Sequence, residues 1–171
     1  MKSIEKITEK LRSISVVGRI AFIIMCIEKY LVAKYPQKDW SPLTEEMWRF
    51  SDSYWDEWLY SFIDLLPEYI NEYNNFEEYN GKYSYDTFAN LYADIKNDVN
   101  ELLNLLTEFM ELYMYTCVCE FNESEFPKFI KKVLSYLIKN NIPIPDVEKV
   151  SFSEFRQNHG FGEKFDFVNN T

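Results

Sequence analysis

The most apolar run of the chain is residues 15–36, SVVGRIAFIIMCIEKYLVAKYP. Its apolar residues recur at helical spacing, and the predicted buried face carries Ile20, Ile23, Ile24, Ile27 and Leu31. A membrane-spanning helix needs about 20 mostly apolar residues, whereas Arg19, Glu28 and Lys29 interrupt this run. Because the residue before a proline disfavours the helical conformation, the helix is expected to end at Tyr35-Pro36. The sequence therefore predicts a buried core helix over about residues 15–34.

The composition of the whole chain supports the same fold class. Of its 171 residues, 47% are hydrophobic and 18% are aromatic, while Gly and Pro number only 4 and 6. An all-β fold needs more turn residues, and this apolar content excludes a disordered chain. We therefore predict a single all-α domain over residues 1–171. It is expected to be a bundle of about five to seven helices at residues 1–145, with an irregular aromatic tail, 146–171, packed on it.

Helical spacing and capping residues predict the remaining helices. Ser41 as N-cap and Pro42 at the first helical position begin one that carries a tryptophan stripe and breaks at Ser61 or Asp64. A short helix is predicted from about residue 3, and a further segment reaches about residue 79. The pattern over about 86–121 forms one long helix or two with a kink. After a break at 122–127, Ser124 is expected to cap a helix over about 125–139. A short helix near residues 153–158 is the one regular element considered for the tail.

Two of these patterns also predict which side chains are buried. In the 86–121 pattern, the expected core face carries Phe88, Leu91, Tyr92, Ile95, Val99, Leu102, Leu106, Phe109 and Tyr113. The acidic residues expected to point away from that face are Asp94, Asp98, Glu101 and Glu108. In the 125–139 helix, the expected core residues are Phe129, Ile130, Val133, Leu134, Leu137 and Ile138.

Cysteine usage and the N-terminal residues bear on the compartment. Cys26, Cys117 and Cys119 are an odd number, which is atypical of a secreted disulfide framework. Reduced thiols in the cytosol are the simpler interpretation. Residues 1–11 form a charged amphipathic stretch rather than a signal peptide. These features predict a cytoplasmic protein without a membrane anchor.

The net charge of −10 is unevenly distributed along the chain. Residues 1–40 carry a net +4 and residues 126–171 a net +2, whereas residues 41–125 contain 19 acidic and only 3 basic residues, a net −16. An acidic surface repels phosphates, so direct binding to nucleic acid is not expected. Because a charge excess of this size opposes compaction, it favours a functional reason for the acidic segment.

In the acidic segment, carboxylates alternate with large aromatic side chains. A protein-binding surface uses aromatic anchors for affinity, and charge for association rate and partner choice. The sequence therefore predicts a surface for a basic protein partner, with the candidate residues Asp52, Asp56, Glu68, Tyr69, Glu72, Tyr73, Glu77, Glu78 and Tyr79. The alternative interpretation places Trp48, Trp55 and Trp58 in the core and makes the carboxylates a solvated face.

Residues suited to catalysis or metal binding are scarce in the sequence. The one histidine, His159, has no Glu three residues before it, so the Glu-x-x-His pairs of a di-metal bundle are missing. Cys117 and Cys119 would point to different sides of a helix, and with Cys26 they offer at most three thiolates. No nucleophile elbow, phosphate loop or dinucleotide-binding glycine pattern is present. We predict no catalytic, cofactor or metal site, and no enzymatic activity.

Three short segments and one tryptophan resemble a known family. Arg19-Ile20-Ala21-Phe22, Glu28-Lys29-Tyr30-Leu31 and Tyr35-Pro36, followed by Trp48, are similar to the N-terminal part of all-α immunity proteins from bacterial polymorphic-toxin systems of the contact-dependent inhibition type. The resemblance covers mainly residues 15–60, and Lys29 stands where Arg is commoner. Arg19 and Glu28 lie about 2.5 turns apart on one helix. Each is therefore expected to meet a charge on a neighbouring helix or to cap one.

The resemblance implies a cytoplasmic antidote that binds a cognate protein toxin and blocks it without catalysis. Many such toxins are nucleases with basic clefts, which an acidic aromatic surface can occupy in place of phosphate. Two alternatives are an acidic adaptor or DNA-mimic module that binds another basic protein, and a metal-dependent enzyme of helical-bundle type. No cofactor, nucleic acid or membrane partner is expected, and self-association into a homodimer stays open.

Overall fold

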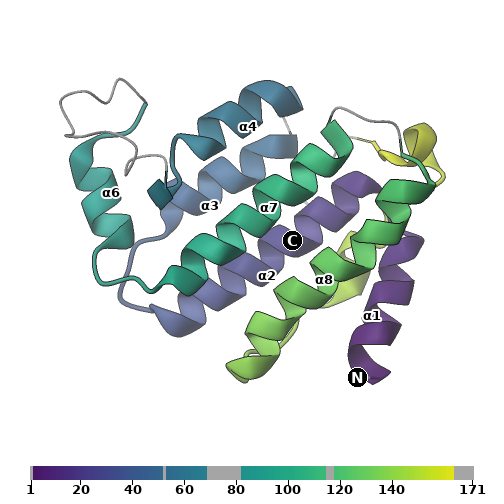
Figure 1. The fold of residues 1–171 in the computed structure, drawn as a ribbon, viewed down its shortest axis with the longest axis horizontal. Helices are drawn as coiled ribbons and strands as arrows, with labels where there is room; N and C mark the ends of the chain where they lie inside the picture. The colour runs from purple at the N-terminus through teal and green to yellow at the C-terminus, as the bar shows by residue number, and fades with distance from the viewer. Residues whose placement is uncertain (1, 52, 69–81, 115–117, 164–171) are drawn as a thin grey trace.

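The computed structural model describes residues 2–51, 53–68, 82–114 and 118–163. Within these ranges the protein is an all-α bundle without β-strands, as predicted. Its α-helices are α1 (Lys2–Arg12), α2 (Val16–Lys34), α3 (Ser41–Trp48), α4 (Trp55–Ile63), α6 (Tyr85–Tyr92), α7 (Asn97–Met114) and α8 (Glu120–Lys139), and its 3₁₀ turns are η1 (Arg49–Ser51), η3 (Val147–Val150) and η4 (Gln157–Gly160). Figure 1 shows α7 crossing in front of α2, with α3 and α4 to one side and α1 and α8 to the other.

Helix α2 forms the centre of the core because nearly its whole surface is apolar. Every residue from Val16 to Ile27 is buried, and α3, α7 and α8 pack against this helix. Ser15 is its N-cap, and the Ser15 hydroxyl accepts a hydrogen bond from the Gly18 amide at 3.2 Å. The buried helix predicted over residues 15–34 is therefore confirmed, as is the short helix near the N-terminus.

The single helix predicted from Ser41 to about residue 61 or 64 was wrong, because this segment forms two helices. Helix α3 ends at Trp48, and α4 starts at Trp55 after the η1 turn. The indole of Trp58 is fully buried and donates to the carbonyl oxygen of Glu46 at 2.6 Å. Twelve residues span about 18 Å in a continuous helix, so this bond requires α4 to turn back against α3.

The N-cap of α3 lies one residue earlier than predicted. Trp40 is the N-cap, so Ser41 and Pro42 occupy the first helical turn. The Ser41 hydroxyl donates to Asp39 Oδ1 at 2.6 Å instead of capping the helix. A carboxylate is a stronger acceptor than a neutral group, which explains why the hydroxyl turns toward Asp39.

The pattern over residues 86–121 forms α6 and α7, separated by a tight connection in which Asp94 has a φ of +62°. All of its predicted core residues are buried or packed against the core. The prediction that Asp98 points away from the core was wrong, because its carboxylate accepts a hydrogen bond from the Tyr30 hydroxyl of α2 at 2.5 Å. The other predicted outward-facing carboxylates are exposed, namely Asp94, Glu101 and Glu108.

Helix α8 begins at Glu120, so the break predicted at residues 122–127 was wrong. Pro127 lies inside the helix, where a proline costs about 3 kcal/mol relative to alanine. Tertiary contacts hold the turn before it: Asn122 Nδ2 donates to the Leu112 carbonyl at 2.5 Å, and Glu123 pairs with Arg19. The core assignment of Ile138 was also wrong, because its side chain is 45% exposed at the end of the helix.

The described part of the tail packs on the N-terminal end of α2. The Ser15 amide donates to the Ser153 carbonyl at 2.8 Å, and the two hydroxyl oxygens lie 2.5 Å apart. Gly162, with a φ of +87°, passes so close to Ser15 that a Cβ at this position would overlap the Ser15 side chain. The short helix predicted near residues 153–158 was wrong, because η4 at residues 157–160 is a short turn in which Asn158 and His159 have positive φ values.

Candidate partner-binding surface

Exposed carboxylates gather on the outer sides of α4 and α7, two helices that pack against each other. The inner side of α4 contributes buried Trp58, Leu59 and Phe62 to the core. Because successive turns of a helix repeat about every 3.6 residues, each of the two helices also has a side that faces away from the core. We call the resulting set the acidic face; its members are Asp56 and Glu57 on α4, Glu68 after α4, and Glu101, Glu108 and Glu111 on α7, all exposed.

Two of the sequence-predicted partner-binding residues belong to this face. Asp56 lies in the first turn of α4. Glu68 is held beside α7, because its carboxylate accepts hydrogen bonds from Asn100 Nδ2 at 2.5 Å and from Asn104 Nδ2 at 3.0 Å. The other predicted residues lie outside the described part of the chain, namely Asp52, Tyr69, Glu72, Tyr73, Glu77, Glu78 and Tyr79.

Two exposed tyrosines next to the acidic face were not among the predicted site residues. Tyr54, which precedes α4, is 75% exposed, and Tyr60 within α4 is 67% exposed. Tyr60 lies two residues after the buried Trp58, a spacing that turns it to another side of the helix and could have identified it. Tyr54 lies four residues before Trp58, a spacing that shares a face within a helix, but it is the extended N-cap of α4 and projects outward, so no helical spacing identifies it. The face therefore combines carboxylates with large amphipathic side chains.

Glu46 is a carboxylate of the acidic segment that does not reach the surface. It is 3% exposed and accepts hydrogen bonds from Arg49 Nη1 at 2.8 Å, Lys82 Nζ at 2.9 Å and the Tyr83 hydroxyl at 2.8 Å. Burial alone would raise the pKa of Glu46, but the hydrogen bonds from Lys82, Tyr83 and Arg49 outweigh burial and hold that pKa below its usual value.

The charge of α4 and α7 does not depend on Glu46. Residues 41–125 contain only three basic residues, Arg49, Lys82 and Lys96. Two of the three form ion pairs with Glu46 while staying about half-exposed, at 48% and 50%. None of the three lies within α4 or α7, so the exposed carboxylates of these two helices have no cation on their own helix, which favours a negative potential outside them.

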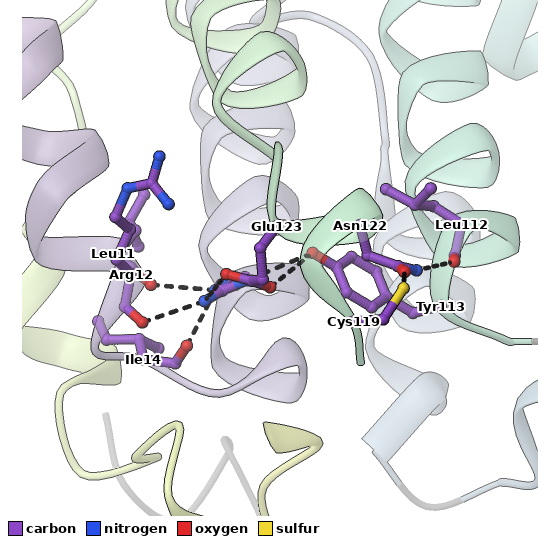
Figure 2. A network of polar contacts seen from close by, with 9 residues as sticks. Leu11, Arg12, Ile14, Leu112, Tyr113, Cys119, Asn122 and Glu123 are labelled. Atoms are coloured by element: carbon purple, nitrogen blue, oxygen red, sulfur yellow. Dashed lines mark hydrogen bonds and ion pairs between the residues drawn. The ribbon is translucent and has the colours of Figure 1, made fainter. Parts of the chain in front are cut away.

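Arg19 was expected to meet a charge on a neighbouring helix, and it does. It is fully buried and forms an ion pair with Glu123 of α8, with 2.6 Å between Nη1 and Oε1. Its guanidinium also donates to three backbone carbonyl oxygens at the end of α1 and to the Tyr113 hydroxyl (Figure 2), the carbonyls being those of Leu11, Arg12 and Ile14. Arg19 therefore stabilises the packing of the helices and is not part of the surface.

Glu28 has a different role from the one expected. Among the residues that the structure describes, no charged side chain pairs with Glu28; its carboxylate accepts a hydrogen bond from Trp48 Nε1 at 2.7 Å. Burial raises the pKa of Glu28, and the hydrogen bond from Trp48 only partly opposes that rise. Glu28 also lines a pocket of about 650 Å³ between α2 and α3, bordered by Lys29 and the exposed Val32.

The described residues offer little for metal or thiol chemistry. Among them, no three His, Cys, Asp or Glu side chains converge as metal ligands. Cys26 is buried, and burial raises the pKa of its thiol well above the usual value. Cys119 is exposed, and its Sγ lies 2.5 Å from Asn122 Oδ1 (Figure 2). In the same part of the chain, every helix is too short or too polar to cross a membrane.

Known proteins provide no relatives from which a role could be transferred. No protein-family model, no curated protein and no solved structure matches the chain. The likeness of residues 15–60 to immunity proteins therefore stays a prediction.

Proposed function

We propose that this protein is an immunity protein, a non-catalytic domain that binds a basic toxin domain through the acidic face and blocks it. The observation that carries the proposal is the set of exposed carboxylates on α4 and α7, two helices that contain no basic residue. The resemblance of residues 15–60 to immunity proteins points to the same class.

The two kinds of side chain on this surface have different roles in the proposal. An exposed ion pair contributes only about 0–1 kcal/mol, so carboxylates alone do not produce tight binding. They accelerate association and select a basic partner. Aromatic side chains supply most of the contact energy at interfaces, and Tyr54 and Tyr60 stand next to the carboxylates of α4.

Blocking by occupancy needs no chemistry from this chain. A nuclease binds phosphates in a basic cleft, and carboxylates arrayed on a helix can take their place. The resulting inhibitor would compete with nucleic acid for the cleft. Added salt would weaken the binding of nucleic acid more than that of the inhibitor, because salt screens the charges but not the contacts of the aromatic side chains.

The proposal is tested by co-expressing the chain with the polypeptide encoded immediately upstream. We expect a one-to-one complex on co-purification, tight binding in calorimetric titration and rescue of cell growth. No complex and no rescue would contradict it. Binding to several unrelated nucleic-acid-binding proteins, lost at moderate salt, would instead favour the acidic adaptor or DNA-mimic alternative.

Matched double variants locate the binding surface. Glu57→Lys with Glu108→Lys changes the acidic face, whereas Glu5→Lys with Glu9→Lys makes the same change in net charge at exposed positions of α1. We expect the first pair to weaken binding about tenfold or more, which corresponds to 1.4 kcal/mol, mainly through slower association. Equal effects of the two pairs would show that only total charge matters.

A further inference from the structure

A small aromatic pocket opens at one end of the acidic face. It has a volume of about 300 Å³, and its walls include the rings of Tyr54, Trp55, Tyr113 and Phe161. These residues come from the start of α4, the end of α7 and the tail. Figure 1 shows the end of α7 and the described end of the tail on the same side of the bundle as the start of α2. The pocket thus joins parts of the chain that are distant in sequence.

A strained turn in the tail carries one wall of this pocket. Asn158 and His159 have φ values of 44° and 55°, a left-handed conformation that costs a non-glycine residue of order 1 kcal/mol or more. The turn places Phe161 against Trp55, with ring centroids 5.8 Å apart and planes at 62°. The Val17 amide donates to the Phe161 carbonyl at 3.0 Å and fixes the backbone there. The protein therefore maintains this wall at an energetic cost.

The surroundings of the pocket are negative although its walls carry no charge. Asp56 and Glu57 follow Trp55 directly in the first turn of α4, and both are exposed. Glu111 lies in the last turn of α7, three residues before the pocket residue Met114 and therefore on the same side of the helix. The helix ends do not add to this negative charge, because the C-terminal end of α7 is opposed by the N-terminal ends of α2 and α4, whose Val17 and Trp55 also line the pocket. A side chain that is apolar along its stem and positive at its tip would complement both the walls and the rim.

We propose that this pocket receives an arginine side chain of the basic partner; the inference rests on the proposed function. A guanidinium stacks on aromatic rings and forms forked hydrogen bonds with carboxylates, and it is less strongly hydrated than an ammonium. Arginine is also one of the residues that dominate binding energy at interfaces. A volume of about 300 Å³ accommodates one such side chain and excludes a larger segment of the partner.

The protein already uses this mode of recognition internally. The guanidinium of Arg19 lies over the Phe126 ring at 4.2 Å from its centroid and over Phe155 at 4.9 Å, and it pairs with the Glu123 carboxylate. Tyr113 links the two places, because its hydroxyl contacts Arg19 while the residue also lines the pocket. Aromatic rings and a carboxylate around arginine are thus a combination that this fold supports.

The first test uses the intact wild-type protein and three single-residue probes: N-acetylated methylamides of arginine, lysine and phenylalanine. Each is titrated into ¹⁵N-labelled protein, and the Trp55 indole signal is followed. We expect the arginine probe to shift this signal with an affinity at least threefold higher than the lysine probe. Equal responses to arginine and lysine would overturn the inference, as would stronger binding of the phenylalanine probe, which would indicate an apolar anchor.

A pair of variants compares the loss of a ring inside the pocket with the loss of a ring outside it on the same helix. Trp55→Leu removes a pocket ring, whereas Tyr60→Leu removes an exposed ring of the same helix that does not line the pocket. We expect Trp55→Leu to weaken the arginine probe at least threefold and the captured partner at least tenfold, and Tyr60→Leu to leave the arginine probe unchanged. If the captured partner binds Trp55→Leu as tightly as wild type, the pocket proposal is contradicted but the proposed function is not. If the pocket prefers the arginine probe but no partner protein is captured, the proposed function is contradicted but the arginine preference of the pocket is not.

Discussion

Arg19 of α2 and Glu123 of α8 form a two-pronged ion pair inside the bundle, with Nη1–Oε1 at 2.6 Å and Nη2–Oε2 at 3.1 Å. Arg19 is fully buried, while 22% of the Glu123 side chain is exposed. The pair joins two residues that are 104 positions apart in sequence. Because the same guanidinium also binds carbonyl oxygens at the end of α1, one side chain fixes the relative positions of three helices.

Removing the negative charge from this pair should destabilise the fold strongly. Loss of one partner from a buried ion pair typically costs about 3–5 kcal/mol, because the other charge is left uncompensated. We expect Glu123→Gln to lower the free energy of unfolding by about 3 kcal/mol in urea titrations. The matched control is Glu125→Gln on the same helix, whose partner Lys128 is 66% exposed. That change should cost less than about 1 kcal/mol, and equal losses would contradict the role of Arg19.

Glu46 should make the protein less stable in acid. Its pKa in the folded state lies below the unfolded value of 4.5, so its contribution is complete above that pH and is lost as pH falls through the folded pKa. We expect Glu46→Gln to reduce the free energy of unfolding by about 2 kcal/mol at pH 7. The difference from wild type should shrink toward pH 3, and thermal melts at several pH values measure it. A difference that is constant with pH would show that ionisation is not involved.

Glu28 should show the opposite pH dependence. Burial raises its folded pKa above 4.5, so the carboxyl stabilises the fold at low pH, and this contribution is lost as pH rises through the folded pKa. A glutamine keeps an oxygen acceptor for Trp48 without the charge. Glu28→Gln should therefore be more stable than wild type at pH 7, by about 1 kcal/mol or less, with no gain below pH 4. The same thermal melts check this, and a loss of stability at pH 7 would refute it.

Of the two tail glycines, Gly162 should be the more sensitive to substitution by alanine. An alanine there meets the Ser15 side chain and also has to adopt a φ of +87°. At Gly160, φ is +96° but the nearest contact would be a Val118 side-chain carbon at 3.1 Å. We expect Gly162→Ala to cost at least about 2 kcal/mol and to expose residues 146–163 to limited proteolysis, with a smaller effect for Gly160→Ala. The reverse order would mean that the tail is not clamped at Ser15.

Local sequence patterns predicted the helices whose ends and faces depend on neighbouring residues. The apolar run after Ser15 and the stop at Tyr35-Pro36 are such cases. The turn between α3 and α4 was missed because it depends on Trp58 reaching back to the Glu46 carbonyl. The early start of α8 was missed because Arg19 and Leu112 hold the residues before Pro127. Contacts between distant segments outweighed local helix propensity in both places.

The candidate site could be predicted from the sequence only in part. Charge counting identified the acidic segment, and Asp56 and Glu68 do lie on an exposed surface. The sequence did not distinguish Glu46 from its neighbour Glu45, because the residues that bury and neutralise it include Lys82, 36 positions later. The aromatic pocket was also beyond local patterns, since Trp55 and Phe161 meet only in the folded chain.

The burial of Glu46 has a consequence for how this protein can diversify. The carboxylate that organises Arg49, Lys82 and Tyr83 is buried and is separate from the exposed carboxylates of α4 and α7. Exposed carboxylates such as Glu57 and Glu108 can then be gained, lost or repositioned with little effect on the free energy of unfolding. Recognition of new partners can change by single substitutions while the bundle stays the same.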